Sequence, residues 1–167
     1  MKTATSLIVS ALALGILLVT QAALAGSSVV EGKDWNTALP AGWTIQRPDN
    51  ITTELWSGDR TALCGIHVGG TRFATSEEFT AFMMDFTKKG LMNQGLLQMQ
   101  LSYEKVETKS GLGGIEALVD IVPGGRSKRL FFIDGTTGYS LDCETSTHLW
   151  QKHLPDFDQV LQSFDVK

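Results

Sequence analysis

The sequence contains few of the residues on which metal and redox chemistry depend. Its 167 residues include 2 cysteines and 3 histidines. No Cys-x-x-Cys pair is present, which excludes a thioredoxin-like redox motif. His148 and His153 are five positions apart, so on one helix their directions differ by about 140° and they cannot share a metal ion. We therefore predict neither a metal site nor a cofactor.

Motifs that place a catalytic nucleophile or cradle a phosphate are also missing. The nearest approach to the Gly-x-Ser-x-Gly pattern of hydrolases is the segment 138–142, which lacks the second glycine. There is no His-Glu-x-x-His pattern, and the glycines at 111–114 lead into a predicted strand, not a helix N-terminus. We name no catalytic residue and predict that the protein is not an enzyme. The alternative is a small hydrolase, with His148 or His153 near a serine and a carboxylate.

Positive charge is scarce. The chain has 14 basic and 18 acidic residues and a formal net charge of −4, so it lacks the electrostatic footprint of a nucleic-acid-binding protein. Arg126, Lys128 and Arg129 form a local basic cluster, which predicts a surface for an acidic partner or anionic head groups unless it is only a solvated face. Trp56 stands beside a predicted turn and is the other binding candidate, because indole rings are enriched at recognition hot spots.

Long hydrophobic runs are confined to the first 25 residues. A short positive start at Lys2 is followed by the apolar stretch from Leu7 to Leu24, which ends in Ala23-Leu24-Ala25. These features are typical of a secretory signal with small residues at its cleavage site. We predict a cleaved signal peptide over residues 1–25 and a periplasmic or secreted protein that contacts the membrane only through this signal before cleavage. The alternative is an uncleaved anchor, because the run approaches the ~20 residues of a spanning helix.

Both cysteines follow this segment and lie in apolar runs that alternate with polar residues. Cys64 and Cys143 each fall on the apolar side of a predicted strand, in a chain addressed to an oxidising compartment. We predict that the two residues form a structural disulfide. Buried free thiols and a catalytic thiol are the alternatives.

The remaining patterns predict strands, a helix, further strands and a C-terminal helix. Thr75 and Glu78 form a capping box, and Gly90 is expected to end the helix that begins there. Large apolar residues at helical spacing predict its buried stripe: Phe79, Phe82, Met83 and Phe86. Alternating runs predict the strands 43–47, 52–56, 60–68, 97–103, 115–121, 127–134 and 139–144. Pro155 is expected in the first turn of the closing helix, and the alternative is a short turn of helix around His148 to Leu154 that precedes it.

These elements predict an α+β fold. We expect an antiparallel sheet of about six to seven strands, with the capped central helix and the C-terminal helix packed on it. Residues 26–38 are polar and are expected to form a flexible leader. Residues 39–167 are expected to form a single α+β domain.

Three segments carry a resemblance to a known family: LPAGWTIQRPDN at 39–50, TSEEFTAFMMDF at 75–86 and GYSLDCETSTHLWQKHLPDFDQVLQSFDV at 138–166. In these the chain resembles the PsbP-like/Mog-type α/β/α sandwich family, which includes DcrB-like bacterial envelope proteins. The resemblance implies a binding, docking or assembly role, as in photosystem accessory subunits and a nuclear-transport factor. No functional residue is carried over from it.

The predicted signal peptide and the family resemblance together predict a non-enzymatic binding or accessory protein of the cell envelope. Its expected partner is another protein, and no particular oligomeric state is predicted. The alternative within the same class is a periplasmic immunity protein against a secreted toxin.

Cleavage of the signal can be measured directly. The full chain, expressed in a Gram-negative bacterium, should yield a protein that begins at Gly26, because Ala23 and Ala25 occupy the positions that the peptidase reads. Intact-mass spectrometry of the soluble envelope fraction checks this. Ala25→Arg should retain residues 1–25. Recovery of the uncut wild-type chain in the membrane fraction would instead identify an anchor.

Overall fold

The computed structural model describes residues 28–167, and the predicted signal peptide lies outside the described residues. Their largest element is a seven-stranded antiparallel sheet in the order β3-β4-β5-β9-β8-β7-β6. The strands are β3 (Thr44–Gln46), β4 (Thr52–Trp56), β5 (Ala62–Gly70), β6 (Leu97–Glu107), β7 (Gly113–Val122), β8 (Gly125–Asp134) and β9 (Thr137–Ser146). All seven predicted strands are confirmed, and β7, β8 and β9 form the expected meander.

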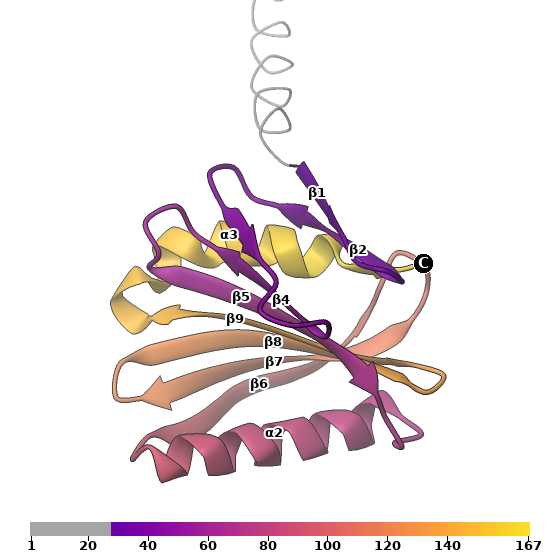
Figure 1. Cartoon of the computed structure of the whole chain (residues 1–167). Helices are drawn as coiled ribbons and strands as arrows, with labels where there is room; N and C mark the ends of the chain where they lie inside the picture. Colours follow the sequence, from indigo (N-terminus) through magenta and orange to yellow (C-terminus); the bar gives the residue numbers. More distant parts are fainter. Residues whose placement is uncertain (1–27) are drawn as a thin grey trace, which may run out of the picture.

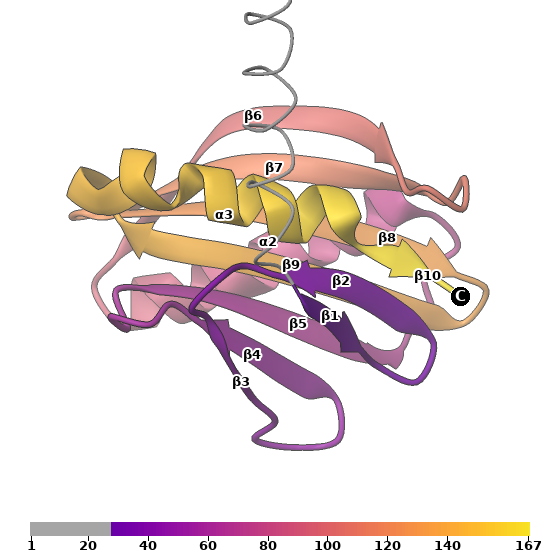
Figure 2. The ribbon, with the colours of Figure 1, turned by 90° about the horizontal axis from the view of Figure 1, so that it is seen from above.

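Helices cover both faces of this sheet, which makes the fold a three-layer sandwich (Figure 1). One face packs against α3 (Trp150–Ser163), which follows the short 3₁₀ turn η1 (Thr147–Leu149). A small sheet of β1 (Ser28–Glu31), β2 (Trp35–Leu39) and β10 (Asp165–Val166) lies beside α3 (Figure 2). On the opposite face, α2 (Ser76–Asn93) packs against β6, β7 and β8. Among residues 28–167, no helix is long and apolar enough to cross a membrane.

The main core lies between the sheet and α3. Alternate residues of the central strands point into it, including Leu55, Ile66 and Leu141, which are fully buried. The stripe of the closing helix meets them as the sequence predicts, with Phe157 and Val160 fully buried. A smaller apolar cluster lies under α2, so each layer is held by burial of its own apolar stripe.

The start of α2 agrees with the capping prediction, whereas its end and its buried face do not. The Thr75 hydroxyl accepts a hydrogen bond from the Glu78 backbone N–H at 3.2 Å. The helix continues through Gly90, and Gly95, with φ of +75°, follows its end. Phe79 is buried, but Phe82 and Phe86 are exposed, because the helix touches the sheet along a narrower stripe than its sequence allows.

The flexible leader predicted for residues 26–38 is wrong. From Ser28 onward this segment forms β1 and β2, and β2 pairs with β10 at the end of the chain. Val30 and Trp35 are buried, and the Trp35 ring stacks on Phe164 at 5.8 Å between ring centres. The domain therefore extends from Ser28 at least. Two apolar side chains in a polar segment are enough to anchor a hairpin when a helix end offers them a surface.

The start predicted for the closing helix is also wrong. Pro155 lies inside α3, which begins five residues earlier at Trp150. Trp150 and Phe157 are both buried, and their rings lie 5.5 Å apart. Burial of Trp150 thus carries the helix upstream of the proline, although proline is disfavoured in a helix interior.

The two cysteines meet across the central ladder. Cys64 on β5 is the register partner of Cys143 on β9, and the structure joins their sulfur atoms in a disulfide. Both residues are fully buried in the main core. The bond closes a loop between positions 79 residues apart, which restricts the unfolded chain strongly.

Removing this bond should destabilise the protein without changing its fold. The double variant Cys64→Ala, Cys143→Ala should lose about 4 kcal/mol of unfolding free energy, the chain-entropy value for a loop of this length. Urea unfolding of both proteins measures the loss. Reduced wild type should resemble the variant. Two free thiols in the unreduced wild-type protein would show that the bond does not form.

Candidate binding cleft

One half of the α2 side of the sheet is left open. The helix packs on β6, β7 and β8, and its Phe79 ring lies against Gly138 at the start of β9, whereas β4, β5 and the end of β9 extend beyond it. On these strands the residues adjacent to core positions point to the open side, because side chains alternate along a strand. Trp56, Leu63 and Glu144 form one row across the three strands, since Leu63 is the register partner of both others.

A cleft of about 620 Å³ lies at the end of this open half. Its walls come from four parts of the chain: the β4–β5 hairpin, the C-terminal end of α2, the β7–β8 turn and the end of β9. The side chains that line it include Trp56, Arg60, Leu63, Leu91, Ile121 and Glu144. The size falls within the range of ligand-binding sites, and the mixture of apolar walls with a few charged groups is typical of them.

Trp56, a binding candidate from the sequence, lies in this cleft and is half-buried. Its indole N–H donates to Glu54 Oε2 at 2.9 Å, which fixes the orientation of the ring. The Arg60 guanidinium lies over the same ring, 5.7 Å from its centre. Arg60 has φ of +56°, a left-handed conformation that is uncommon outside glycine. Such conformations cluster at functional sites and persist only where surrounding contacts hold them.

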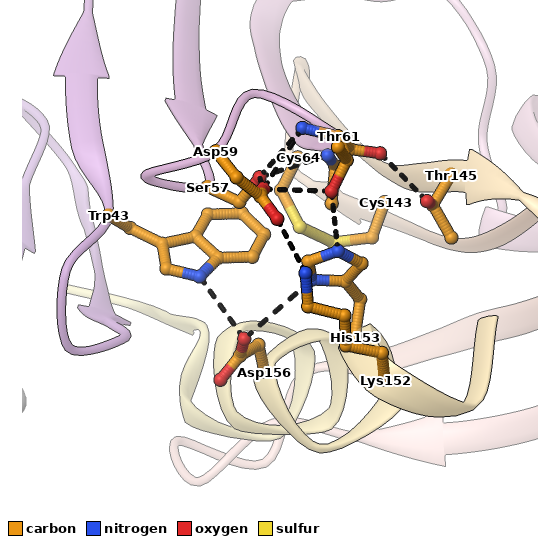
Figure 3. Close-up of polar contacts among 11 residues, drawn as sticks. Trp43, Ser57, Asp59, Thr61, Cys64, Cys143, Thr145, Lys152, His153 and Asp156 are labelled. Carbon is orange, nitrogen blue, oxygen red and sulfur yellow. Dashed lines mark hydrogen bonds and ion pairs between the residues drawn. A yellow bond between two sulfur atoms is a disulfide. The ribbon is translucent and has the colours of Figure 1, made fainter. Parts of the chain in front are cut away.

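Those contacts come from the side chains of the turn itself. Asp59 Oδ1 accepts from the Ser57 and Thr61 hydroxyls, both at 2.8 Å, and from the Thr61 backbone N–H at 3.1 Å (Figure 3). Asp59 Oδ2 pairs with Lys152 on α3. The Lys152 ammonium and these hydroxyls hold the pKa of Asp59 well below its usual range. The turn that carries Trp56 and Arg60 is therefore fixed to a helix of the opposite layer.

A second contact between this turn and α3 involves a buried histidine. Thr61 Oγ1 and His153 Nε2 lie 2.8 Å apart, and His153 is 3% exposed. Because the Thr61 proton is donated to Asp59, the histidine donates through Nε2. His153 Nδ1 is buried and has no hydrogen-bond partner among residues 28–167. Asp156, 4.0 Å from Nδ1, accepts instead from the Trp43 indole at 3.2 Å.

This arrangement is the reverse of a hydrolytic triad. In a triad the nucleophile donates its proton to the histidine, whose other nitrogen donates to a carboxylate. Here the hydroxyl proton goes to Asp59, and Nδ1 has no carboxylate within hydrogen-bond distance. The cluster is suited to holding the hairpin in place. His148 and His67 are exposed and lie outside it.

Glu144 is the acidic group of the cleft. It is exposed at the cleft surface, and its carboxyl makes no hydrogen bond or ion pair with any other residue in the range 28–167. Loss of solvent around its carboxyl raises the pKa of Glu144, and the nearby Asp142 raises it further, against a smaller opposing effect of Arg129. Glu144 is not among the binding candidates chosen from the sequence, although its position next to the inward-facing Cys143 places it on the open side.

The basic cluster predicted from the sequence is not a continuous surface. Arg129 is 3% exposed and lies under α2, where it forms an ion pair with Asp142 at 2.8 Å. It also donates to Thr87 and Gln98, each at 2.9 Å. A buried guanidinium is stable only with such partners, so Arg129 is a structural residue that joins α2 to the sheet.

Arg126 and Lys128 lie on the other face of the sheet, because alternate residues of β8 point in opposite directions. Arg126 pairs with Asp120 at 2.6 Å. Lys128 pairs with Asp158 at 2.9 Å and Glu116 at 3.1 Å. Burial disfavours the charged lysine, but these two carboxylates outweigh it and raise its pKa. The three basic residues are thus neutralised separately, and the structure brings none of them to Trp56.

Within residues 28–167, no group of three histidine, cysteine or acidic side chains is placed to hold a metal ion. The cleft offers ring stacking, apolar contact and one free carboxylate. These groups are suited to binding a ligand.

Comparison with known proteins identifies the fold. The structure of cyanobacterial PsbP (CyanoP) from Synechocystis has a TM-score of 0.68, with 13% identity over 86% of this chain and 94% of that chain. The Ran-binding protein Mog1p of Saccharomyces cerevisiae has a TM-score of 0.59, with 10% identity over 84% of this chain and 95% of that chain. No family model and no curated protein sequence matches the chain. The chain therefore has the PsbP-like/Mog-type fold that its sequence resembles.

The role of Asp59 in fixing the hairpin predicts a dependence of stability on pH. The pKa of Asp59 is lowered in the folded protein. The stabilisation that its charge gives is therefore complete above the pKa of the unfolded chain, about 3.9, and is lost as the pH falls below that value. Asp59→Asn should reduce the unfolding free energy at pH 7, and the difference from wild type should narrow progressively below about pH 4. Urea unfolding across this range tests it. Asp85→Asn, in an exposed pair on α2, is the control and should change little. A difference that does not vary with pH would contradict the role of the Asp59 charge.

Proposed function

We propose that this chain is an exported, non-enzymatic binding or accessory protein of the cell envelope, and that it binds another protein at the Trp56 cleft. The observation that carries the proposal is a half-buried indole whose position is fixed before any ligand arrives. Its N–H is held by Glu54, and its turn is held by Asp59 and α3.

Preorganisation explains why such a site binds well. A side chain that is already ordered loses little conformational entropy when a partner covers it. Tryptophan and arginine are also the residues most enriched at the centres of protein interfaces, and here Trp56 and Arg60 lie in contact. The open half of the sheet leaves room for a partner, because within residues 28–167 the helix on this side, α2, packs on β6, β7 and β8 rather than on β4 and β5.

The comparisons and the N-terminal sequence support the same class. One solved structure with this fold is described as a Ran-binding protein, which is a protein-binding role. The apolar run ending at Ala25 supports export, and the pairing of Cys64 with Cys143 suits an oxidising compartment. A periplasmic immunity protein would be a special case, in which the partner is a toxin.

A hydrolase is less well supported. His153 and His67 each lie near a hydroxyl and a carboxylate. His153 is buried and donates to Thr61. His67 is exposed, and the Thr52 hydroxyl, 3.2 Å from its Nδ1, donates its proton to Asp49. A reaction would need the opposite direction of proton transfer.

Binding through the cleft predicts a selective effect of Trp56→Ala. The mature protein, immobilised and exposed to an envelope extract, should retain one protein that Trp56→Ala does not retain. Loss of a central tryptophan typically costs 2 kcal/mol or more of binding free energy, about a 30-fold weaker affinity. Quantitative mass spectrometry identifies the protein, and calorimetry with the purified partner measures the affinity.

Phe86→Ala is the matched control, because Phe86 is an exposed aromatic residue on α2 and is 63% exposed. It should bind the same partner as wild type. Equal retention by Trp56→Ala would move the interface away from the cleft. Retention of no protein by the wild type, together with hydrolytic turnover that is lost in Thr61→Val, would favour the enzyme.

A further inference from the structure

We propose that the cleft recognises a positively charged group, the ammonium or guanidinium of a lysine or arginine on the partner, with Glu144 as its counter-ion and the apolar walls as the support of its stem. This inference rests on the proposed function and names the chemistry of that site. It follows from which charges of the open face already have partners and which do not.

Glu144 is the carboxylate of this face without a partner. Glu54 accepts from the Trp56 indole at 2.9 Å. Asp142 accepts from the Ser127 hydroxyl and pairs with Arg129 at 2.8 Å. Glu144 has neither kind of contact within residues 28–167, although the walls of the cleft remove part of its solvent. A partly desolvated carboxylate gains most from a cation that replaces its lost water.

The register of the strands places this carboxylate beside an apolar surface. Leu63 lies between Trp56 and Glu144 in the row across β4, β5 and β9. Leu91 and Ile121 line the same cleft from α2 and β7. Lysine and arginine have long apolar stems below their charged groups, so such a side chain can fill the cleft while its charge reaches Glu144.

Arg60, the basic residue that lines the cleft, does not pair with Glu144. It lies over the Trp56 ring instead. Its left-handed backbone, held by the Asp59 turn, directs it to this position. An anionic ligand bound at Arg60 would face the unpaired Glu144 across the same cleft. The unpaired negative charge of Glu144 therefore favours a cationic ligand over an anionic one.

The charge preference can be tested with small probes of one shape. Benzylamine, benzyl alcohol and sodium benzoate share a ring and differ in charge. Each is titrated into the mature protein, and the indole N–H signals are followed by ¹H–¹⁵N NMR spectroscopy. Benzylamine should shift the Trp56 signal and bind at least about tenfold more tightly than the other two, as expected for one charge-assisted hydrogen bond. The buried Trp35 and Trp150 serve as internal references.

Glu144→Gln keeps the shape of the side chain and removes its charge. It should abolish the tenfold preference for benzylamine while binding of benzyl alcohol stays unchanged, which shows that the cleft is intact. Asp85→Asn, which removes an exposed carboxylate of α2 outside the cleft, should keep the preference. Equal binding of all three probes, or a preference for benzoate that is lost in Arg60→Gln, would overturn the inference. Either result leaves the proposed function standing if Trp56→Ala still loses the protein partner.

Discussion

The pairing of β5 with β9 is the constraint on which the rest of the structure depends. These two strands come from distant parts of the sequence, and nine register pairs, from Ala62–Thr145 to Gly70–Thr137, join them. Without this ladder the hairpins of the first half and the meander of the second half would be separate sheets. The Cys64–Cys143 bond lies within the ladder and holds it from the core side. The cleft depends on it as well, because Trp56 belongs to one half and Glu144 to the other.

The two faces of this sheet are covered unequally, and that inequality separates stability from binding. α3 and the small β1-β2-β10 sheet cover one face, where the main core lies. α2 covers β6 to β8 and the start of β9 on the other face and leaves β4, β5 and the end of β9 open. Arg129 lies near the boundary, where its bonds to Asp142, Thr87 and Gln98 close the covered half. A buried guanidinium with several partners fixes the geometry of neighbouring elements even where its net contribution to stability is small.

Much of the fold could be predicted from the sequence, because it depends on local signals. Alternation gave the seven strands, and the capping residues gave the start of α2. The errors lie where the structure depends on contacts between residues that are distant in the sequence. The hairpin of β1 and β2 depends on Phe164 and β10 at the far end of the chain, which no local pattern indicates. Of the residues that line the cleft, only Trp56 is a binding candidate chosen from the sequence. Glu144 and Arg60 are ordinary residues until the β5–β9 register and the Asp59 turn bring them to one cleft. The three basic residues of β8 do not form the predicted single surface, because neighbouring residues of a strand point to opposite faces.

The pairing of β2 with β10 has a consequence for how the chain acquires its structure. One of its first strands has its partner at residues 165–166, and α3 packs against the same strand. Contacts between the two ends of a chain close the longest loops and form slowly. During synthesis from the N-terminus, β2 must wait for β10, and the Trp56 turn must wait for Lys152 and His153 of α3. The Trp56 cleft therefore takes its final shape only after α3 has packed against the sheet, although none of its own walls belongs to α3.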